Sequence, residues 1–415
     1  MENTNQRGLP KDGGADRVHN GAVNLQSILG STTKEDFIRD YWGQRFLHQE
    51  GCPGRFGCLF GWDQLNSILE THQLQSPQLL LVQNGKPIAP SLYLHSRGPG
   101  APPRIKSRDL MKCLAKGATL VLNHIDEIDP ALRDLASNIE DELWVPTSVN
   151  LYGAWRREPG FDLHWDIQET LILQISGRKS WRVYNPTRLH PLKEDVVNAE
   201  VPTGSPVWEG SLSDGDILYM PRGWWHVAIS TDEPSLHLTV TVQPYSGYQF
   251  LGWLVDQLRI EPVVRMDVPH LARLEEQRKY VEKLFDVISQ HCANDLLERF
   301  LRDFDSKIVS RPRFTLPNVA SSTAMDLHAG SLIYLETGRR LGLPTRDQNG
   351  KVEFVANHLR WKCSSALLPA LALLHKGRPR RVSELHSVLN IPEGLHELKM
   401  LLVALAAEGV IAIRD

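Results

Sequence analysis

Cysteine is scarce in this chain. Its 415 residues hold five, at Cys52, Cys58, Cys113, Cys292 and Cys363. An odd, scattered set excludes a disulfide framework and indicates free thiols in a reducing compartment. Cys52 and Cys58 form the one close pair, and no second pair follows that would complete a structural zinc site. We therefore expect neither disulfides nor structural zinc.

Long apolar runs and a large net charge are also missing. No stretch approaches the roughly 18 apolar residues of a membrane-spanning helix, and the N-terminus lacks the apolar core of a signal peptide. We expect a soluble, intracellular, cytoplasmic protein that does not associate with membranes. The formal net charge of −3 argues against a generally basic nucleic-acid binder, although a local basic patch stays possible.

The length exceeds what one hydrophobic core usually supports, so several domains are expected. Residues 1–22 are polar and read as a disordered leader. The composition of the whole chain, 41% hydrophobic and 23% charged, is that of a globular protein. We place domain boundaries so that 23–246 forms the first domain, 247–320 a helical domain and 321–415 a third.

The first domain is predicted to contain both helices and strands. Helices are expected after the possible caps Ser31, Thr32 and Thr33, over 107–114 and over about 130–143, with a buried strand at 118–125. From 146 to 245, β-rich runs such as ETLILQI, SWRVY and LHLTVTVQ follow one another at short intervals, with turn residues between them. This spacing is typical of an antiparallel sandwich or barrel.

Beyond residue 248 the periodicity becomes helical. Apolar residues recur three and four apart in 250–258 and throughout 271–301, which predicts one long amphipathic helix that packs internally or against a second subunit. Further helices near 366–375, 383–389 and 393–407, followed by the strand VIAI, predict a C-terminal winged helix. Its expected recognition helix has only Lys399 as a fixed cation, and the basic cluster KGRPRR at 376–381 precedes it, so we expect no specific DNA binding.

The run FDLHWDIQETLILQI holds the first candidate metal ligands. In a strand His164 and Asp166 would point to the same side, and His226, in DGDILYMPRGWWHVA, would supply a third ligand. Two imidazoles and one carboxylate are the facial triad of non-haem iron(II) oxygenases, which leaves positions open for a co-substrate and O₂. The alternative is that His164 and Asp166 are merely a satisfied polar pair. Glu169 has the opposite parity and is rejected as a ligand.

Lys179 is the candidate partner for an anionic co-substrate. If Ser176-Gly177 is a two-residue hairpin turn, Lys179 faces the same side as His164 and Asp166. A buried ammonium needs an anion, and the distal carboxylate of 2-oxoglutarate would provide one. In a different register Lys179 would be solvated.

Farther along the chain, His237, Thr239 and Thr241 alternate onto one face. Thr241 could donate a hydrogen bond to the co-substrate, or it could be an ordinary strand residue.

With HWD, GRKSW and DILYMPRGWWH, the chain resembles the JmjC-type ribosomal oxygenases of the cupin superfamily. The resemblance runs from the segment FIRDYWGQRFL to the C-terminal winged helix. It implies an α+β fold with a double-stranded β-helix (the cupin jelly roll), a helical dimerisation domain and a winged helix. It also implies that His164, Asp166 and His226 bind Fe(II), and that Lys179 pairs with 2-oxoglutarate.

For the substrate, the resemblance implies further residues and partners. Asn150 and Tyr152, in NLY, match a pattern near the substrate pocket of the histidine-hydroxylating members. The implied substrate is a histidine or arginine of a ribosomal protein, hydroxylated at the β-carbon by a homodimer. Asp162 departs from the small or proline residue often found there. The alternatives left open are a hydroxylase of another peptide, an N-methyl-lysine demethylase and a non-catalytic nucleic-acid-binding or scaffold protein.

Overall fold

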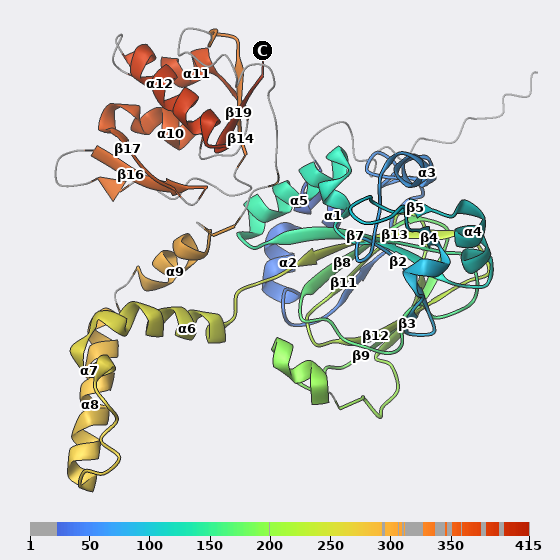
Figure 1. The fold of residues 1–415 in the computed structure, drawn as a ribbon, viewed down its shortest axis with the longest axis horizontal. Helices are drawn as coiled ribbons and strands as arrows, with labels where there is room; N and C mark the ends of the chain where they lie inside the picture. The colour runs from blue at the N-terminus through green and yellow to red at the C-terminus, as the bar shows by residue number, and fades with distance from the viewer. Residues whose placement is uncertain are drawn as a thin grey trace, which may run out of the picture. The chain divides into compact units, whose positions relative to one another are not determined.

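The computed structural model describes residues 23–198, 200–292, 295–305, 307–308, 311, 327–336, 345–346, 351–357, 359–374, 379–389 and 394–414. They divide into two compact units, one ending at Pro244 and the other beginning at Tyr245 (Figure 1). The expected leader, 1–22, lies outside the described residues. No helix among the described residues is long and apolar enough to cross a membrane.

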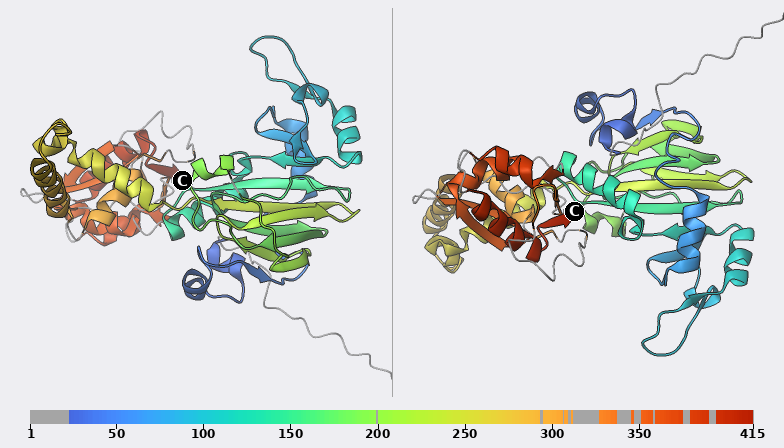
Figure 2. Two further views of the ribbon diagram at one scale, coloured as in Figure 1. Left: turned by 90° about the horizontal axis from the view of Figure 1, so that it is seen from below. Right: turned by 90° about the horizontal axis from the view of Figure 1, so that it is seen from above.

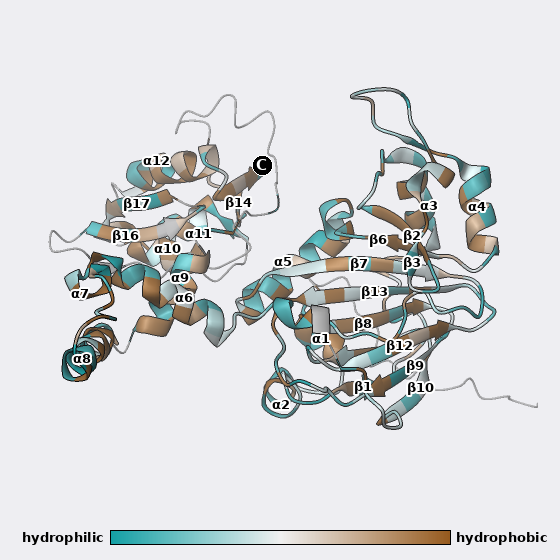
Figure 3. Ribbon diagram, turned by 60° about the horizontal axis from the view of Figure 1, so that its bottom comes forward, coloured by the Kyte–Doolittle hydropathy of each residue, from teal (hydrophilic) through white to brown (hydrophobic). Residues whose placement is uncertain are grey.

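The first unit is built on two facing sheets. The larger has eight strands in the spatial order β1 (Leu47–Gln49), β11 (Ile217–Met220), β8 (Glu169–Ser176), β13 (Ser235–Val242), β7 (Thr147–Ala154), β6 (Thr119–Leu122), β2 (Leu79–Gln83) and β3 (Lys86–Pro87). The smaller has three, β10 (Trp208–Leu212), β9 (Lys179–Tyr184) and β12 (Trp225–Ser230). All of these pairings are antiparallel, and Figure 3 shows the strands stacked side by side.

A core between the two sheets holds them together. Ile172 of β8 packs in one buried cluster with Trp181 and Val183 of β9 and with Leu218 of β11. Each of these side chains comes from the inward-facing set of its strand, because side chains in a strand alternate between the two faces. The expected sandwich is therefore present.

The predicted hairpin between β8 and β9 is wrong. β8 pairs with β11 and β13, whereas β9 pairs with β10 and β12 in the other sheet. Gly177, with φ of +67°, turns the chain from one sheet to the other, and a Cβ there would lie 2.0 Å from the carbonyl oxygen of Pro234. Crossing between the sheets buries the inner faces of both strands against each other, which a flat hairpin would not do.

Short helices flank the large sheet. They are α1 (Leu25–Leu29), α2 (Lys34–Asp40), α3 (Trp62–Thr71), α4 (Ser107–Ala115) and α5 (Pro130–Leu143), with short 3₁₀ turns at Pro90–Leu92, Ile125–Glu127 and Lys193–Asn198. The prediction for α5 is confirmed. Asp129 caps its first turn by accepting from the backbone N–H groups of Ala131 and Leu132, and Pro130 occupies the first helical position, where no N–H is needed. α2 begins after its cap Thr33.

The first unit also contains a small two-stranded sheet. Its strands are β4 (Leu94–His95) and β5 (Arg104–Ile105), paired antiparallel. The loop that joins them extends away from the two main sheets (Figure 2).

The second unit begins with helices. They are α6 (Gly247–Gln257), a 3₁₀ turn (Leu258–Ile260), α7 (Pro262–Arg265), α8 (Leu274–His291) and α9 (Leu296–Asp305). Trp253 and Leu254 of α6 share a buried cluster with Leu296 and Phe300 of α9. The single helix expected over 271–301 is wrong, because α8 ends at His291 and α9 starts at Leu296. The apolar period continues across the break, so periodicity alone could not locate it.

The C-terminal part surrounds a second core. The strands β18 (Arg380–Arg381), β14 (Leu332–Leu335) and β19 (Ile411–Arg414) form one sheet, and β15 (Thr345–Arg346), β16 (Lys351–Ala356) and β17 (Leu359–Ser364) form another. The helices are α10 (Leu368–Leu374), preceded by a 3₁₀ turn (Ser365–Leu367), α11 (Val382–Ser387) and α12 (Gly394–Ala407). Leu371, Leu385, Leu402 and Ile413 bring these elements into one buried cluster. Residues 376–378 of the basic cluster KGRPRR lie outside the described residues.

Candidate active site

The structure brings His164, Asp166 and His226 together. One ligand atom from each lies within 4.8 Å of the others. The Nε2 atom of His226 is 3.6 Å from the Oδ2 atom of Asp166, and the two imidazole rings have centroids 4.3 Å apart. Within the described residues this is the one group of three His, Cys, Asp or Glu side chains with metal-binding spacing. The spacing suits a divalent metal bound at about 2 Å from each ligand atom.

Hydrogen bonds orient both imidazoles. The Nδ1 atom of His164 lies 2.7 Å from the carbonyl oxygen of Asp162, and that of His226 lies 3.1 Å from the carbonyl oxygen of Trp224. Because a carbonyl oxygen can only accept, each Nδ1 must carry the proton. Each Nε2 therefore keeps its lone pair, which is the arrangement that a metal-binding histidine requires.

Local backbone structure fixes the spacing of the triad. His164 and Asp166 are not in a regular strand as predicted, since β8 starts only at Glu169. Instead, His164 forms an isolated antiparallel bridge with His226, in which each backbone N–H donates to the other residue's carbonyl, at 3.1 and 2.7 Å. Gly223, with φ of +84°, donates its N–H to the carbonyl oxygen of Asp166 at 2.9 Å. The two ligand segments are thus tied to each other by backbone hydrogen bonds.

Burial keeps His226 in the neutral form. It lowers the pKa of His226 to about 4, with the neighbouring His164 adding to the effect and Asp166 opposing it. A neutral imidazole is the form that binds metal, because protonation would occupy its lone pair.

Lys179 is buried in the same pocket, with 4% of its surface exposed. No side chain among the described residues forms an ion pair or hydrogen bond with its ammonium, which lies 6.0 Å from the centroid of the Trp181 ring. Burial lowers the pKa of Lys179 to about 8. The predicted inward orientation therefore holds although the predicted register was wrong, because β9 alternates as expected within its own sheet.

Two of the three β13 residues that were predicted to share one face line the pocket. His237 and Thr239 line the pocket, and Thr241 is not among the lining residues. Thr241 pairs with Thr170 and Ser148, two residues, or about 7 Å, farther along the strand. His237 stacks on Tyr152 with ring centroids 4.9 Å apart, and its Nδ1 atom is buried without a hydrogen-bond partner among the described residues.

The two residues suggested by the Asn-x-Tyr pattern behave differently. Tyr152 lines the pocket, and burial, aided by the charge of Asp166, raises the pKa of its hydroxyl. Asn150 is not a lining residue. Its Oδ1 atom accepts a hydrogen bond from the backbone N–H of His124 at 3.0 Å, and it also hydrogen-bonds to Tyr152. Asn150 thus reaches the pocket only through Tyr152.

Glu169 points away from the triad, as its parity predicted. It is 2% exposed and accepts a hydrogen bond of 2.5 Å from the hydroxyl of Tyr219. Burial raises the pKa of Glu169, and the hydrogen bond from Tyr219 opposes that rise. Glu169 therefore belongs to the fold and not to the pocket.

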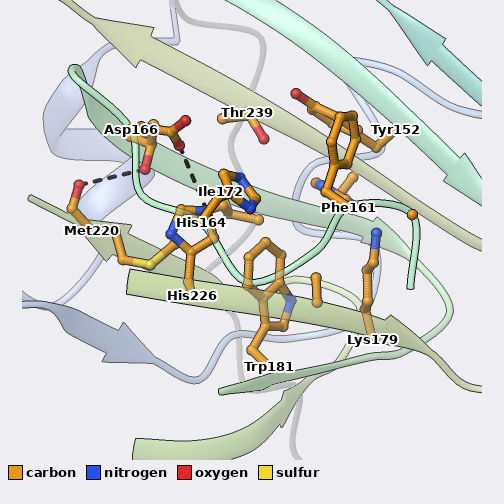
Figure 4. Close-up of a pocket in the computed structure, with 14 residues that line it drawn as sticks. Tyr152, Phe161, His164, Asp166, Ile172, Lys179, Trp181, Met220, His226 and Thr239 are labelled. Carbon is orange, nitrogen blue, oxygen red and sulfur yellow. Dashed lines mark hydrogen bonds and ion pairs between the residues drawn. The ribbon is translucent and has the colours of Figure 1, made fainter. Parts of the chain in front are cut away.

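The triad, Lys179, Tyr152 and His237 line one cavity of about 220 Å³. In Figure 4 the ring of Trp181 lies between the triad and Lys179. The sequence reasoning did not single out the apolar residues of the wall, which are Phe161, Ile172, Trp181, Met220 and Ala228. Trp181 could have been found, because it follows Lys179 by two residues in one strand and so shares its face. The cavity therefore has the ammonium of Lys179 at one end, the group of His164, Asp166 and His226 at the other, and an apolar wall between them.

Comparison with known proteins agrees with this geometry. Residues 117–250 match a family model described as a JmjC domain. The chain is 26% identical over 242 residues to the "Bifunctional lysine-specific demethylase and histidyl-hydroxylase NO66" of Drosophila persimilis, covering 55% of this chain and 33% of that protein. It is 28% identical over 247 residues to the NO66 protein of Drosophila melanogaster, covering 56% of this chain and 36% of that protein. The chain thus spans about a third of the length of these curated relatives.

Solved structures show the same fold over nearly the whole chain. The ribosomal oxygenase YcfD from Escherichia coli superposes with a TM-score of 0.58 and 18% identity, covering 93% of this chain and 99% of YcfD. A complex of YcfD with cobalt and 2-oxoglutarate superposes with a TM-score of 0.60, again at 18% identity and with the same shares of the two chains covered. The resemblance read from the sequence is confirmed: residues 117–250 match a JmjC domain, and the chain has the fold of YcfD over nearly its whole length.

Proposed function

We propose that the chain is an Fe(II)- and 2-oxoglutarate-dependent dioxygenase that hydroxylates a histidine or arginine side chain of a ribosomal protein. The observation that carries this proposal is the convergence of His164, Asp166 and His226 in one pocket with the unpaired, buried Lys179. The protein named YcfD has been crystallised with cobalt and 2-oxoglutarate, and the name of the NO66 relatives includes histidyl-hydroxylase.

The donor set fits the metal. Two neutral imidazoles and one carboxylate suit Fe(II) and leave coordination positions open. His164, Asp166 and His226 would hold the iron, which together with 2-oxoglutarate and O₂ supplies the oxidising chemistry. None of the three is a thiolate, so the ligands themselves resist oxidation.

Lys179 is suited to bind the co-substrate. Its side chain is buried and has no carboxylate partner among the described residues, so an incoming anion would replace solvation lost on folding. We assign it to the distal carboxylate of 2-oxoglutarate. Thr239, which lines the pocket where Thr241 was expected to, is the nearer hydroxyl on β13 for this role.

Other lining residues exclude water and orient the substrate. Phe161, Trp181 and Ile172 provide an apolar wall that keeps bulk solvent from the reacting groups. The Tyr152 hydroxyl, held in its protonated form by burial, can donate a hydrogen bond to a substrate peptide. Asn150 positions Tyr152.

Other inferences concern the second unit and the location. We assign α6–α9 to homodimerisation, because their outer faces leave large apolar side chains in solvent. Among these, Tyr248 is 67% exposed, Leu251 59% and Phe285 64%.

The helices α10–α12 with β14, β18 and β19 match the helix-and-strand order of a winged helix, which we propose to be a packing or docking unit without specific DNA affinity. A ribosomal substrate also agrees with a cytoplasmic location.

Intact-mass analysis of ribosomal proteins tests the reaction. Cells with and without the gene are compared, and one ribosomal protein should be heavier by about 16 Da, one oxygen atom, only when the gene is present. Expression of the His226→Ala variant in cells that lack the gene should not restore the added mass. An unchanged set of masses would count against the ribosomal substrate.

Demethylation is the second candidate, because the name of the NO66 relatives includes a lysine-specific demethylase. The same mass experiment separates the two, since loss of an N-methyl group lowers the mass by about 14 Da and releases formaldehyde.

A further inference from the structure

One segment of the first unit has a charge opposite to that of the rest of the chain. Residues 84–117, here named the basic lobe, contain seven Lys and Arg and a single acidic residue, Asp109. This leaves 39 of the 46 Lys and Arg, and 48 of the 49 Asp and Glu, for the remaining residues. A lobe of net charge +6 thus stands on a chain that is otherwise acidic.

The lobe is folded and its cations face solvent. Tyr93, Leu94, Leu110 and Leu114 are buried beneath it, which anchors β4 and α4 to the unit. The exposed cations on its surface are Lys86, Arg97, Arg104, Arg108, Lys112 and Lys116. The loop between β4 and β5, which carries Arg97, extends into solvent (Figure 2).

Most of these cations lack an acidic partner. Lys112 lies 3.6 Å from Asp109, and the remaining basic residue of the lobe, Lys106, donates to the carbonyl oxygen of Ser91 at 2.7 Å. Lys86, Arg97, Arg104, Arg108 and Lys116 form no ion pair with any described residue. Five exposed cations without acidic partners among the described residues thus belong to one lobe, and an external polyanion would neutralise them.

The base of the lobe adjoins the segment that leads into the pocket. The backbone N–H groups of Asn84 and Gly85 donate to the carbonyl oxygens of Pro159 and Gly160 at 3.2 and 3.1 Å. Gly160 and the following Phe161 line the cavity. At the other end of the lobe, the Nε atom of Arg156 donates to the carbonyl oxygen of Ala115 at 3.4 Å. A molecule held on the lobe would therefore lie beside whatever enters the pocket.

We propose that the basic lobe binds the phosphate backbone of RNA, so that the enzyme meets its substrate histidine or arginine in an RNA-bound ribosomal protein. This inference rests on the proposed function. Ribosomal proteins carry a positive charge to neutralise RNA, so the lobe would repel the substrate chain itself and attract the RNA that accompanies it. Arginine forks bind phosphate oxygens in a bidentate manner, which suits Arg97, Arg104 and Arg108.

The lobe's surface also predicts how it reads RNA. Its one aromatic side chain other than His95, that of Tyr93, is buried, so no aromatic platform is exposed on which bases could stack. Binding through phosphates alone carries no direct sequence information. We therefore expect salt-dependent binding that is indifferent to sequence and independent of the winged helix.

The test measures binding of a labelled oligouridylate of about 20 nucleotides to the full chain by fluorescence anisotropy. The lobe variant carries Lys86→Gln, Arg97→Gln, Arg104→Gln, Arg108→Gln and Lys116→Gln. The matched control removes five exposed cations elsewhere on the same unit, through Arg39→Gln, Arg45→Gln, Arg178→Gln, Arg182→Gln and Arg188→Gln. Both variants have the same net charge.

The slope of log affinity against log salt should be about −3.5 for five phosphate contacts on a single strand, and it should approach zero in the lobe variant. The lobe variant should bind at least about tenfold more weakly near 0.1 M salt, and the control within about threefold of the parent. An equal loss in the control would mean that net charge alone matters and would overturn the proposal. Stronger lobe-dependent binding to phosphatidylserine vesicles than to the oligouridylate would overturn it in favour of a membrane surface.

Turnover with a short peptide substrate separates this proposal from the proposed function. The lobe variant should hydroxylate a free peptide as fast as the parent, because no lobe residue lines the pocket. Lobe-dependent RNA binding without any 2-oxoglutarate turnover would refute the enzyme assignment and keep the RNA surface. Turnover without lobe-dependent binding would do the reverse.

Discussion

Replacing Lys179 by methionine should stabilise the protein while removing its co-substrate site. Lys179 is buried without an anion among the described residues, and burial lowers its pKa from 10.5 to about 8. At neutral pH this difference corresponds to about 3 kcal/mol of unfavourable free energy. The contact with the Trp181 ring returns about 0.5–1 kcal/mol. Since methionine fills a similar volume without a charge, we expect Lys179→Met to raise the free energy of unfolding by about 2–3 kcal/mol.

The gain should depend on pH in one direction. Between about pH 8 and pH 10.5 the unfolded chain binds a proton on Lys179 that the folded chain has released, so the stability of the parent rises with pH there. Below about pH 8 the parent bears the whole cost. The difference between variant and parent should therefore fall from about 3 kcal/mol near pH 7 to about 1.5 kcal/mol near pH 9.5, before the Trp181 contact is subtracted.

The measurement is urea unfolding without metal or 2-oxoglutarate, monitored by tryptophan fluorescence at both pH values. Lys116→Met, which alters an exposed lysine of the same unit, should change stability by less than about 0.5 kcal/mol. In parallel, 2-oxoglutarate should stabilise the metal-loaded parent and not Lys179→Met. A variant no more stable than the parent near pH 7, or a gain that does not change with pH, would show that the Lys179 ammonium is not desolvated.

Three further predictions follow from other contacts. His226→Ala should abolish Co(II) binding, measured by titration calorimetry, with an unchanged circular dichroism spectrum; retained stoichiometric binding would reject the triad. Tyr219→Phe should lower the free energy of unfolding by about 1–3 kcal/mol, because the buried carboxylate of Glu169 loses its hydrogen bond, and Co(II) affinity should stay the same; a stability within about 0.5 kcal/mol of the parent would contradict this reading. Light scattering should find a dimer for the parent and a monomer for the Leu251→Glu and Phe285→Glu double variant; a monomeric parent would remove the assigned role of α6–α9.

The sequence was most informative where one rule decides the structure. Glu169 does not line the pocket, as its parity predicted. Lys179 does line it as predicted, although the hairpin from which its direction was derived is absent. The helix expected over about 130–143 is present at Pro130–Leu143, where Asp129 caps the first turn and Pro130 occupies the first helical position.

Other features depend on contacts between distant segments and could not be read from the chain. The crossing at Gly177 is set by Pro234, 57 positions later in the sequence, and the choice of Thr239 over Thr241 depends on where β13 passes the triad. The carbonyls of Asp162 and Trp224 that orient the imidazoles lie two residues before each histidine. Their orientation is set by loop conformations that periodicity does not describe.

The backbone bridge between His164 and His226 determines what happens to the pocket when metal is lost or a ligand residue is replaced. Two main-chain hydrogen bonds hold these residues opposite each other. The distance between the two imidazoles is therefore set by the backbone and does not depend on a bound metal. Removal of a metal bound there should therefore leave the two imidazoles in place. For the same reason, a variant in which a small polar residue replaces one of these histidines would keep the shape of the cavity. Lys179 would still line that cavity, which could then bind a different anion.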